Sequence, residues 1–164
     1  MSSLELALPE LRPSQWLSLQ HEYDRFDGRG GNTSPQLQWQ GLPEGTRSLA
    51  LTLFDPDAPT GSGFWHWVAF DLPPTLDGLP VAAGSPSVAT LESGGLQARN
   101  DFGHHGYGGP CPPVGAQPHR YQFTLHALDT ERLGVDAETP NAIVRYLVHS
   151  RSLASAQVIA LYGR

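Results

Sequence analysis

The sequence predicts an all-β domain whose strands are joined by long, ordered connections. Of its 164 residues, 39% are hydrophobic and only 16% are charged, and glycine and proline together supply about a fifth of the chain. This much glycine and proline would interrupt the helices of a bundle, while the aromatic content is too high for a disordered chain. The length suits one domain, residues 1–164, that can bury a core without disulfides or a structural metal.

The predicted strands follow from short apolar runs and from period-2 alternation. The clearest cover residues 48–54, 64–71, 121–128 and 157–162, and a weaker one covers 36–40. Segment 64–71 is apolar on both parities, so we expect a central strand that is covered on both faces. Segment 121–128 alternates apolar with polar residues, which predicts one drier face.

One helix is predicted near the C-terminus. Thr139 can cap a helix that begins at Pro140, because proline tolerates the first helical position. Its apolar face is expected to comprise Ala142, Ile143, Tyr146, Leu147 and Ser150. A shorter helical turn is expected after Asp129, and the rest is predicted to be loop, above all 72–102 and 103–118.

The charge pattern excludes several classes of protein. The net charge is −6, and all ten bases are arginine, so lysine Schiff-base chemistry and a phosphate-loop lysine are excluded. An acidic chain also lacks the clustered positive charge that nucleic acids or anionic membranes attract. Cys111 is the only cysteine, so no internal disulfide can form, which is compatible with a reducing compartment.

No targeting or membrane segment is predicted. Residues 1–13 have no positively charged start, and Glu5, Pro9 and Glu10 interrupt their apolar residues, which is not typical of a secretory signal. No run approaches the ~18 apolar residues of a membrane span. The sequence therefore predicts a cytoplasmic protein without a membrane span.

The first chemical motif is Asp55-Pro56-Asp57-Ala58-Pro59, directly after a predicted strand. A two-residue spacing puts both carboxylates on one side of an extended backbone, and the prolines make a stiff corner. Two aspartates held this close repel each other, so we expect a cationic or hydrogen-bond-donating neighbour. A plain Asp-Pro turn is the alternative interpretation.

His66 supplies the candidate neighbour. It lies between Trp65 and Trp67 in the most apolar strand, where a histidine is often only a hydrogen-bonded core residue. However, the four-residue connection 60–63 folds this strand back beside the preceding one. We therefore expect His66 to lie within a few residues of Asp55 across the strand pair.

The third motif is the segment 103–118, in which nine of sixteen residues are glycine or proline. It runs directly into His119-Arg120-Tyr121, where His119 and Tyr121 point to one side. A flexible linker is one interpretation, but loops this long inside a compact domain are more often functional. Glycines would let backbone N–H groups approach a ligand as an anion-binding nest, and prolines would stiffen the frame.

These blocks, in this order and spacing, resemble the signatures of the phosphatidylethanolamine-binding protein family, and most closely its small bacterial branch. The resemblance extends to Asn32-Thr33-Ser34-Pro35 and to residues 153–162, so it covers nearly the whole chain. It implies an antiparallel Greek-key β-sandwich with a few short helices and a small, partly exposed pocket for phosphate, phosphoryl groups or similar anions. In many animal members a C-terminal helix lies over the pocket, and gating by such a helix is not expected here.

The resemblance also implies the ligand-binding residues: Asp55, Asp57, His66, Gly109, Pro110, His119 and Tyr121. We hypothesise that N–H groups near Gly109 and the two imidazoles donate to the anion, while an aspartate orients one histidine. A free carboxylate could meet the ammonium of an ethanolamine-like head group. The expected protein is a binding protein, monomeric or homodimeric, with no cofactor and no enzymatic activity. Inhibition of kinases or proteases is implied by the resemblance alone.

Two alternatives remain open. A hydrolase could use the Asp–His cluster, although no nucleophile signature is present and Cys111 is the only thiol. A metal could bind either to His104-His105 or to the cluster formed by Asp55, Asp57, His66 and His119. Neither arrangement matches a standard ligand spacing.

Overall fold

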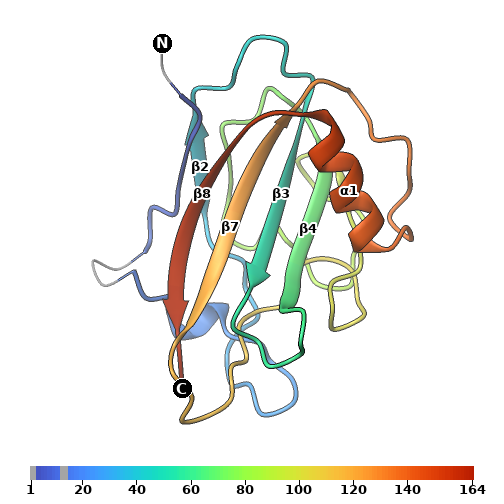
Figure 1. The fold of residues 1–164 in the computed structure, drawn as a ribbon. Coiled ribbons are helices and arrows are strands. Elements are labelled where there is room, and N and C mark those ends of the chain that lie inside the picture. Colours follow the sequence, from blue (N-terminus) through green and yellow to red (C-terminus); the bar gives the residue numbers. More distant parts are fainter. Residues whose placement is uncertain (1–2, 12–14) are drawn as a thin grey trace.

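The computed structural model describes residues 3–11 and 15–164, which form two antiparallel sheets and one α-helix (Figure 1). Residues 1–2 and 12–14 belong to the N-terminal segment whose sequence is not typical of a secretory signal, and they lie outside the described residues. Among the residues described, no helix is long and apolar enough to cross a membrane.

The larger sheet has five strands in the order β6-β4-β3-β7-β8, and every neighbouring pair is antiparallel. Its strands are β3 (Ser48–Asp55), β4 (Phe64–Leu72), β6 (Leu96–Gln97), β7 (His119–Leu128) and β8 (Ser152–Tyr162). The smaller sheet contains β1 (Glu5–Ala7), β2 (Leu37–Gln40) and β5 (Gly78–Leu79), and a 3-10 turn, η1, covers Leu19–His21. The predicted antiparallel Greek-key sandwich is confirmed.

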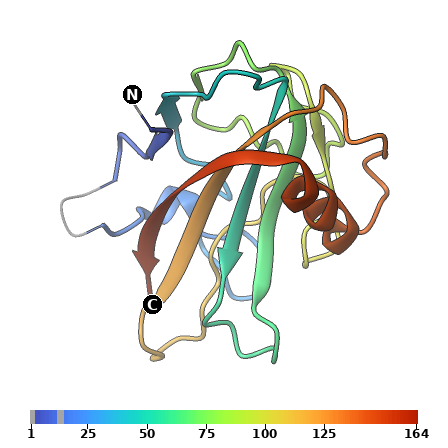
Figure 2. The same cartoon turned by 45° about the horizontal axis from the view of Figure 1, so that its top comes forward.

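The main core lies between the two sheets. Leu49, Leu51 and Leu53 of β3 are fully buried there and pack with Trp39 of the small sheet. Burying each leucine contributes about 1.5–3 kcal/mol to folding. A second apolar cluster lies on the other face of the large sheet, beneath the helix α1 (Asn141–Arg151) (Figure 2).

The four strong strand predictions are confirmed, with longer boundaries in each case. The largest extension is in β8, which begins at Ser152 rather than at residue 157. Residues 152–156 carry little apolar signal, yet they pair with the last four residues of β7, from Leu125 to Leu128. The prediction of uninterrupted loop over 72–102 was wrong, because the two-residue strands β5 and β6 lie in it. Strands this short carry no periodicity, and backbone pairing with β2 and β4 defines them.

The C-terminal helix is confirmed, but its predicted apolar face was wrong. Val144 and Val148 are the buried residues and pack on the outer face of the large sheet, whereas Ile143 is 49% and Tyr146 72% exposed. Thr139 makes no cap either: its hydroxyl contacts Asp136. No helical turn follows Asp129 in the described residues of that segment. The helix packs through two small β-branched residues one turn apart, because it crosses the sheet closely.

The strand directions bring the chemical motifs to one edge. In Figure 1 the end of β3 and the starts of β4 and β7 lie together at the lower edge of the large sheet. Asp55 is the last residue of β3, and Phe64 pairs with it from β4. His119 is the first residue of β7, which is the other neighbour of β3. Segments that are far apart in the sequence therefore converge there.

Candidate functional site

A cavity of about 230 Å³ opens at this edge of the sheet. Four of its polar side chains come from β3, β4 and β7, and they are Asp55, His66, His119 and Tyr121. Each of these four residues is at most 6% exposed. Their polar groups therefore lie in surroundings of low dielectric constant. The structure therefore gathers four of the seven predicted site residues around one space.

Asp55 and His119 form a hydrogen-bonded pair at the cavity. His119 Nδ1–H donates to Asp55 Oδ2 at 2.7 Å, and the backbone N–H of Asp57 donates to Asp55 Oδ1 at 2.8 Å. Both carboxylate oxygens thus have a donor. The pair fixes the orientation of the His119 ring and leaves Nε2 as the nitrogen without a partner among the described residues.

A β-bulge turns His66 toward this pair. Leu53 pairs with Trp67 but Phe54 pairs with Trp65, so His66 is the extra residue on β4. A bulge of this kind re-aims a side chain that regular alternation would place on the opposite face. As a result the His66 ring lies 5.4 Å from the Tyr121 ring, centroid to centroid, on the inner side of the sheet.

His66 is held as a neutral imidazole. Burial lowers its pKa to about 4, a shift that the hydrogen bond to Gly108 and the nearby Asp55 charge only partly oppose. Its Nδ1–H donates to the Gly108 carbonyl at 2.6 Å. A neutral ring with hydrogen on Nδ1 presents the lone pair of Nε2, so this nitrogen is a hydrogen-bond acceptor.

Tyr121 brings an unused donor. Its ring is fully buried, and its hydroxyl is buried without a hydrogen-bond partner in the described residues. Burial, followed by the Asp55 charge, raises the pKa of this phenol, so the hydroxyl keeps its proton. A buried hydroxyl without a partner is costly, and in a cavity it marks a place where a ligand atom could accept a hydrogen bond.

Asp57 has a different environment from Asp55. Its carboxylate accepts three hydrogen bonds from Arg120: one from the backbone N–H at 2.8 Å and two from the guanidinium at 2.8 and 3.0 Å. The Arg120 side chain lowers the pKa of Asp57 through these bonds. Asp57 is not among the described residues that line the cavity. Asp57 connects the corner after β3 to Arg120, the second residue of β7. Because Arg120 neutralises its carboxylate, Asp57 has no unpaired charge for a ligand.

The glycine–proline segment is packed more tightly than the sequence predicts. The backbone N–H of Gly109, which we expected to face an anion, instead donates to Asn32 Oδ1 at 2.7 Å. A Cβ at Gly109 would lie 2.1 Å from the His21 carbonyl oxygen, so only glycine fits. The Pro110 carbonyl accepts the N–H of Tyr23 at 2.9 Å. Both residues fix the loop that holds the cavity wall, and neither lines the cavity.

The apolar wall includes residues that sequence reasoning missed. Phe102 is the main one: its ring stacks on Tyr23 at 3.8 Å and meets the edge of His66 at 5.6 Å. Phe64 and Pro112 also line the cavity. Phe102 lies in a connection whose sequence has no periodic pattern. The only signal for it in the sequence was a large aromatic residue in a segment predicted to be loop.

Cys111 lines the cavity but is not activated as a nucleophile. Burial raises the pKa of its thiol. The thiol donates to Asp27 Oδ1 at 3.6 Å, and no hydrogen bond joins it to His119 in the described part of the chain. A nucleophilic cysteine needs an adjacent base or a lowered pKa. The geometry therefore does not support cysteine hydrolase chemistry.

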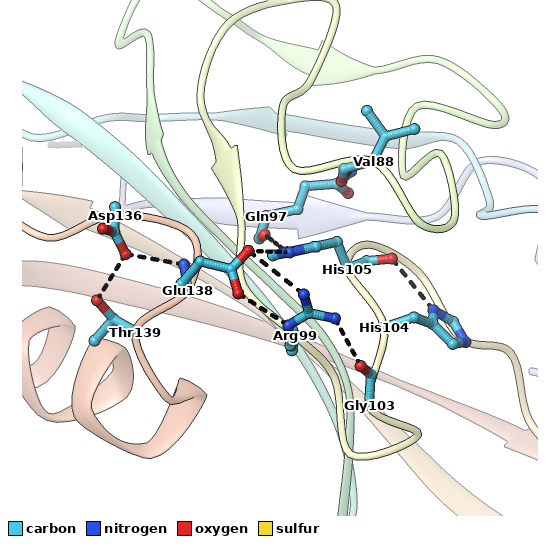
Figure 3. Close-up of polar contacts among 9 residues, drawn as sticks. All are labelled: Val88, Gln97, Arg99, Gly103, His104, His105, Asp136, Glu138 and Thr139. Carbon is cyan, nitrogen blue, oxygen red and sulfur yellow. Dashed lines mark hydrogen bonds and ion pairs between the residues drawn. The ribbon is translucent and has the colours of Figure 1, made fainter.

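His104 and His105, which precede Cys111 in the same connection, do not form a metal site. His104 Nε2 contacts the Tyr23 hydroxyl at 2.9 Å, whereas both ring nitrogens of His105 contact acceptors, Glu138 Oε1 and the Gln97 carbonyl, each at 2.8 Å. Figure 3 shows the two rings pointing to different partners. Within residues 3–11 and 15–164, no group of three or more histidine, cysteine, aspartate or glutamate side chains is placed to hold a metal ion.

Comparisons with known proteins identify the family of the chain. The family model for the phosphatidylethanolamine-binding protein matches residues 11–163. The chain is 44% identical to the UPF0098 protein YbcL of Escherichia coli, over 98% of this chain and 88% of YbcL, and 46% identical to YbhB of the same organism, over 98% and 100%. These relatives are not named as enzymes.

Solved structures give the same picture. The crystal structure of E. coli YbcL, described as a new member of the mammalian PEBP family, superposes with a TM-score of 0.93 at 44% identity and 99% coverage of both chains. The carboxypeptidase Y inhibitor, solved with its cognate proteinase, shares the fold at a TM-score of 0.54 and 19% identity, over 98% of this chain and 82% of the inhibitor. The chain therefore belongs to the phosphatidylethanolamine-binding protein family.

Proposed function

We propose that this protein binds a small anionic or phosphorylated ligand in the cavity and does not transform it. The ligand would contact three side chains, His66, His119 and Tyr121, while Asp55 would act through His119. The observation that supports this most strongly is that three polar atoms at one cavity, two imidazole Nε2 atoms and one phenol hydroxyl, have no partner among the described residues. Of these three atoms the phenol hydroxyl is fully buried. Buried polar groups are normally satisfied, so a ligand is the expected partner of this hydroxyl.

His119 would be the main donor to an oxyanion. With Nδ1–H held by Asp55, uptake of a proton at Nε2 gives an imidazolium whose charge the buried carboxylate compensates. Nε2–H and the Tyr121 hydroxyl can then both donate to ligand oxygens. Asp55 would act through His119 rather than on the anion, which explains how an acidic residue belongs to an anion site.

His66 would select the protonation state of the ligand. Because Nε2 of its neutral ring accepts, the ligand must offer a donor at that position. A monohydrogen phosphate dianion or a phosphomonoester monoanion has one P–OH group to donate, and an ethanolamine-like head group has an ammonium. A fully deprotonated anion without any donor would leave this acceptor unpaired.

The remaining predicted site residues would have supporting roles. Asp57 holds the start of β7 through Arg120, and Gly109 and Pro110 fix the loop behind the cavity. Three or four charge-assisted hydrogen bonds at about 1.5–3 kcal/mol each, less several kcal/mol for association, give micromolar to millimolar affinity. Weak, reversible binding is the expected behaviour.

Catalysis and protease inhibition are less well supported than binding. No nucleophile among the described residues is hydrogen-bonded to His119, whose partner is Asp55. The likeness to the carboxypeptidase Y inhibitor, at 19% identity, extends to the fold alone. The cavity and its polar atoms are specific features of these side chains.

The test is a titration followed by NMR of the histidine rings. Inorganic phosphate and phosphoethanolamine are added separately at constant ionic strength, and we expect saturable shifts of the His66 and His119 ring nitrogens at millimolar concentration or below. His119→Gln should weaken phosphate binding by about tenfold or more, since it removes a charge-assisted contact.

His149→Gln is the matched control, because His149 is exposed on α1 and does not line the cavity. Its phosphate affinity, read from the His66 signal, should equal that of the wild type. If His66 and His119 do not respond to either ligand, or if sodium chloride produces the same shifts, the proposal is wrong.

A further inference from the structure

A second polar groove, of about 300 Å³, lies on the opposite face of the large sheet beside α1. Its floor is formed by residues of β3, β7 and β8 whose side chains alternate with those of the main core, including Thr52, Thr124, His126 and Gln157. Arg145 and His149 of α1 form one wall. None of its lining residues lines the cavity that holds Asp55, so the two sites are separate.

Arg145 gives the groove a partly buried positive charge. Its Nε and Nη2 donate to the neutral Asn141 Oδ1 at 3.2 and 3.1 Å, and its guanidinium lies 3.8 Å from the centre of the Trp65 ring. In the described part of the chain, no carboxylate oxygen lies within 4.0 Å of it. Burial lowers the pKa of Arg145, and the charge of Asp101 opposes this shift only in part.

His126 is a second polar group without a partner. It is 6% exposed, and its Nδ1 is buried with no hydrogen bond to any described residue. The ring of His149 meets it edge-on, with 5.3 Å between centroids. An unsatisfied nitrogen in the floor of a groove is costly unless something else binds there. His126 and Arg145 thus each offer a polar group that a ligand could bind.

The lining also limits the chemistry of that ligand. The Trp65 ring is already covered by Phe54, at 4.1 Å between centroids, and by Arg145, so it offers no free aromatic surface for a sugar ring. A floor of hydroxyl and amide groups does not suit an apolar ligand. The hydroxyls of Thr52 and Thr124 can donate to an oxyanion, as can Nη1 of Arg145, which donates to no described residue.

We propose that this groove is a binding site for a small oxyanion, a carboxylate or a phosphate group, held by the guanidinium of Arg145 together with threonine hydroxyls and the ring of His126. The site lies on the outer face of the sheet and works independently of the cavity at the strand ends. Both a planar carboxylate and a tetrahedral phosphate offer two oxygens that a guanidinium group can bind. The test distinguishes the two ions.

The experiment titrates the protein with acetate, succinate and phosphate in separate series at constant ionic strength. The NMR signals of the His126 ring and of Arg145 Nε–H report on the groove, and those of His66 report on the strand-end cavity. We expect at least one anion to shift the His126 and Arg145 signals in a saturable way, with the stronger series identifying the oxyanion. In Arg145→Gln the apparent dissociation constant from the His126 signal should rise about tenfold or more.

Arg151→Gln is the matched control, because Arg151 lies on the same helix, is paired with Asp129 at 2.7 Å, and loses the same charge. Its anion response at His126 should equal that of the wild type. Thermal unfolding of both variants shows whether each is folded, and Thr124→Val, which keeps the helix intact, should also weaken the response.

Three outcomes would overturn the proposal. The His126 signal could stay unmoved by all three anions, it could respond equally in Arg145→Gln and wild type, or it could respond equally to chloride. A response at His66 without one at His126 would support the strand-end cavity and reject the groove. A response at His126 without one at His66 would do the reverse.

Discussion

Asp55 accepts a 2.7 Å hydrogen bond from His119 across the edge of the sheet, and each of the two residues is at least 94% buried. The residues come from the end of β3 and the start of β7, which are neighbouring strands separated by 63 residues of chain. Through this bond the carboxylate fixes the imidazole ring that faces the cavity. The integrity of the bond should therefore control both ligand binding and local stability.

Asp55→Asn tests this pair. The substitution keeps the shape but removes the charge that supports a protonated His119, so we expect phosphate affinity to fall about tenfold or more. The loss of a charge-assisted bond should also lower the free energy of unfolding by about 1–3 kcal/mol, as measured by urea denaturation.

Asp24→Asn is the control for this change, because Asp24 is exposed and makes only a 3.9 Å ion pair with Arg25. It should alter stability by less than about 0.5 kcal/mol. Equal phosphate affinity in Asp55→Asn and wild type would show that the carboxylate has no part in binding.

The sequence indicated this cavity well where the spacing was local and poorly where packing decided the outcome. The Asp-Pro corner and the short link to His66 predicted that His66 lies near Asp55, and parity predicted that His119 and Tyr121 share a side. That the two pairs meet at one cavity was implied by the family resemblance alone. The bulge at His66 could not be predicted, because it depends on the register between β3 and β4. Gly109 was assigned to the ligand because glycine permits close approach, and the approaching group proved to be the Asn32 side chain.

The helix shows the same division. Its position follows from Pro140 and from the apolar residues, but the buried face depends on how the helix packs on the sheet.

Val144→Ala should lower the free energy of unfolding by roughly 1–3 kcal/mol, because Val144 is fully buried against the sheet. The control Ile143→Ala removes more carbon from a residue that is 49% exposed, yet should cost less. The opposite order in thermal or urea unfolding would restore the face that the sequence predicted.

Glu138 ties the loop before α1 to the connection that carries Phe102 (Figure 3). Its bonds to Arg99, and then to His105, lower the pKa of this carboxyl from its usual 4.5. A carboxyl with a lowered folded-state pKa stabilises the fold fully above its unfolded value, and this contribution is lost as the pH falls through the lowered one. Glu138→Gln should therefore destabilise the protein at about pH 7, and its difference from wild type should shrink as the pH falls below the ordinary glutamate pKa of 4.5.

The difference between the urea midpoints of Glu138→Gln and wild type, followed against pH, measures this contribution. Glu131→Gln serves as the control, because Glu131 is an exposed residue 4.0 Å from Arg47. It should show little difference at any pH. A difference for Glu138→Gln that does not shrink on acidification would mean that the carboxylate charge is not what stabilises the loop.

His126 also makes stability fall on acidification, but the cause is burial of the ring rather than an ion pair. Burial, and then the neighbouring His149, lower its pKa to about 4 from 6.5. Between these values the unfolded chain binds a proton that the folded chain does not, so stability falls as the pH is lowered from about 6.5 to 4. His126→Leu removes this penalty together with an unsatisfied nitrogen, and should raise the free energy of unfolding by ~1–2 kcal/mol at pH 5 relative to wild type. A smaller gain at pH 5 than at pH 7 would contradict this sign.

Tyr121→Phe should separate function from stability. The phenol hydroxyl has no partner in the described residues, so its removal relieves a buried unsatisfied group, and the ring can keep its packing. We expect the free energy of unfolding to stay equal or rise by up to about 1 kcal/mol, while phosphate affinity falls severalfold. Tyr146→Phe, at a tyrosine that is 72% exposed on α1, should change neither quantity.

The combination of these two results is what identifies a ligand contact. If Tyr121→Phe destabilised the protein by more than about 1 kcal/mol, the hydroxyl would have a structural partner and would not be available to a ligand. If stability rose but phosphate affinity were unchanged, the cavity would bind its ligand through the two histidines alone. Only unchanged or higher stability together with weaker binding supports a hydroxyl kept in an unfavourable buried position for the sake of the bound oxyanion.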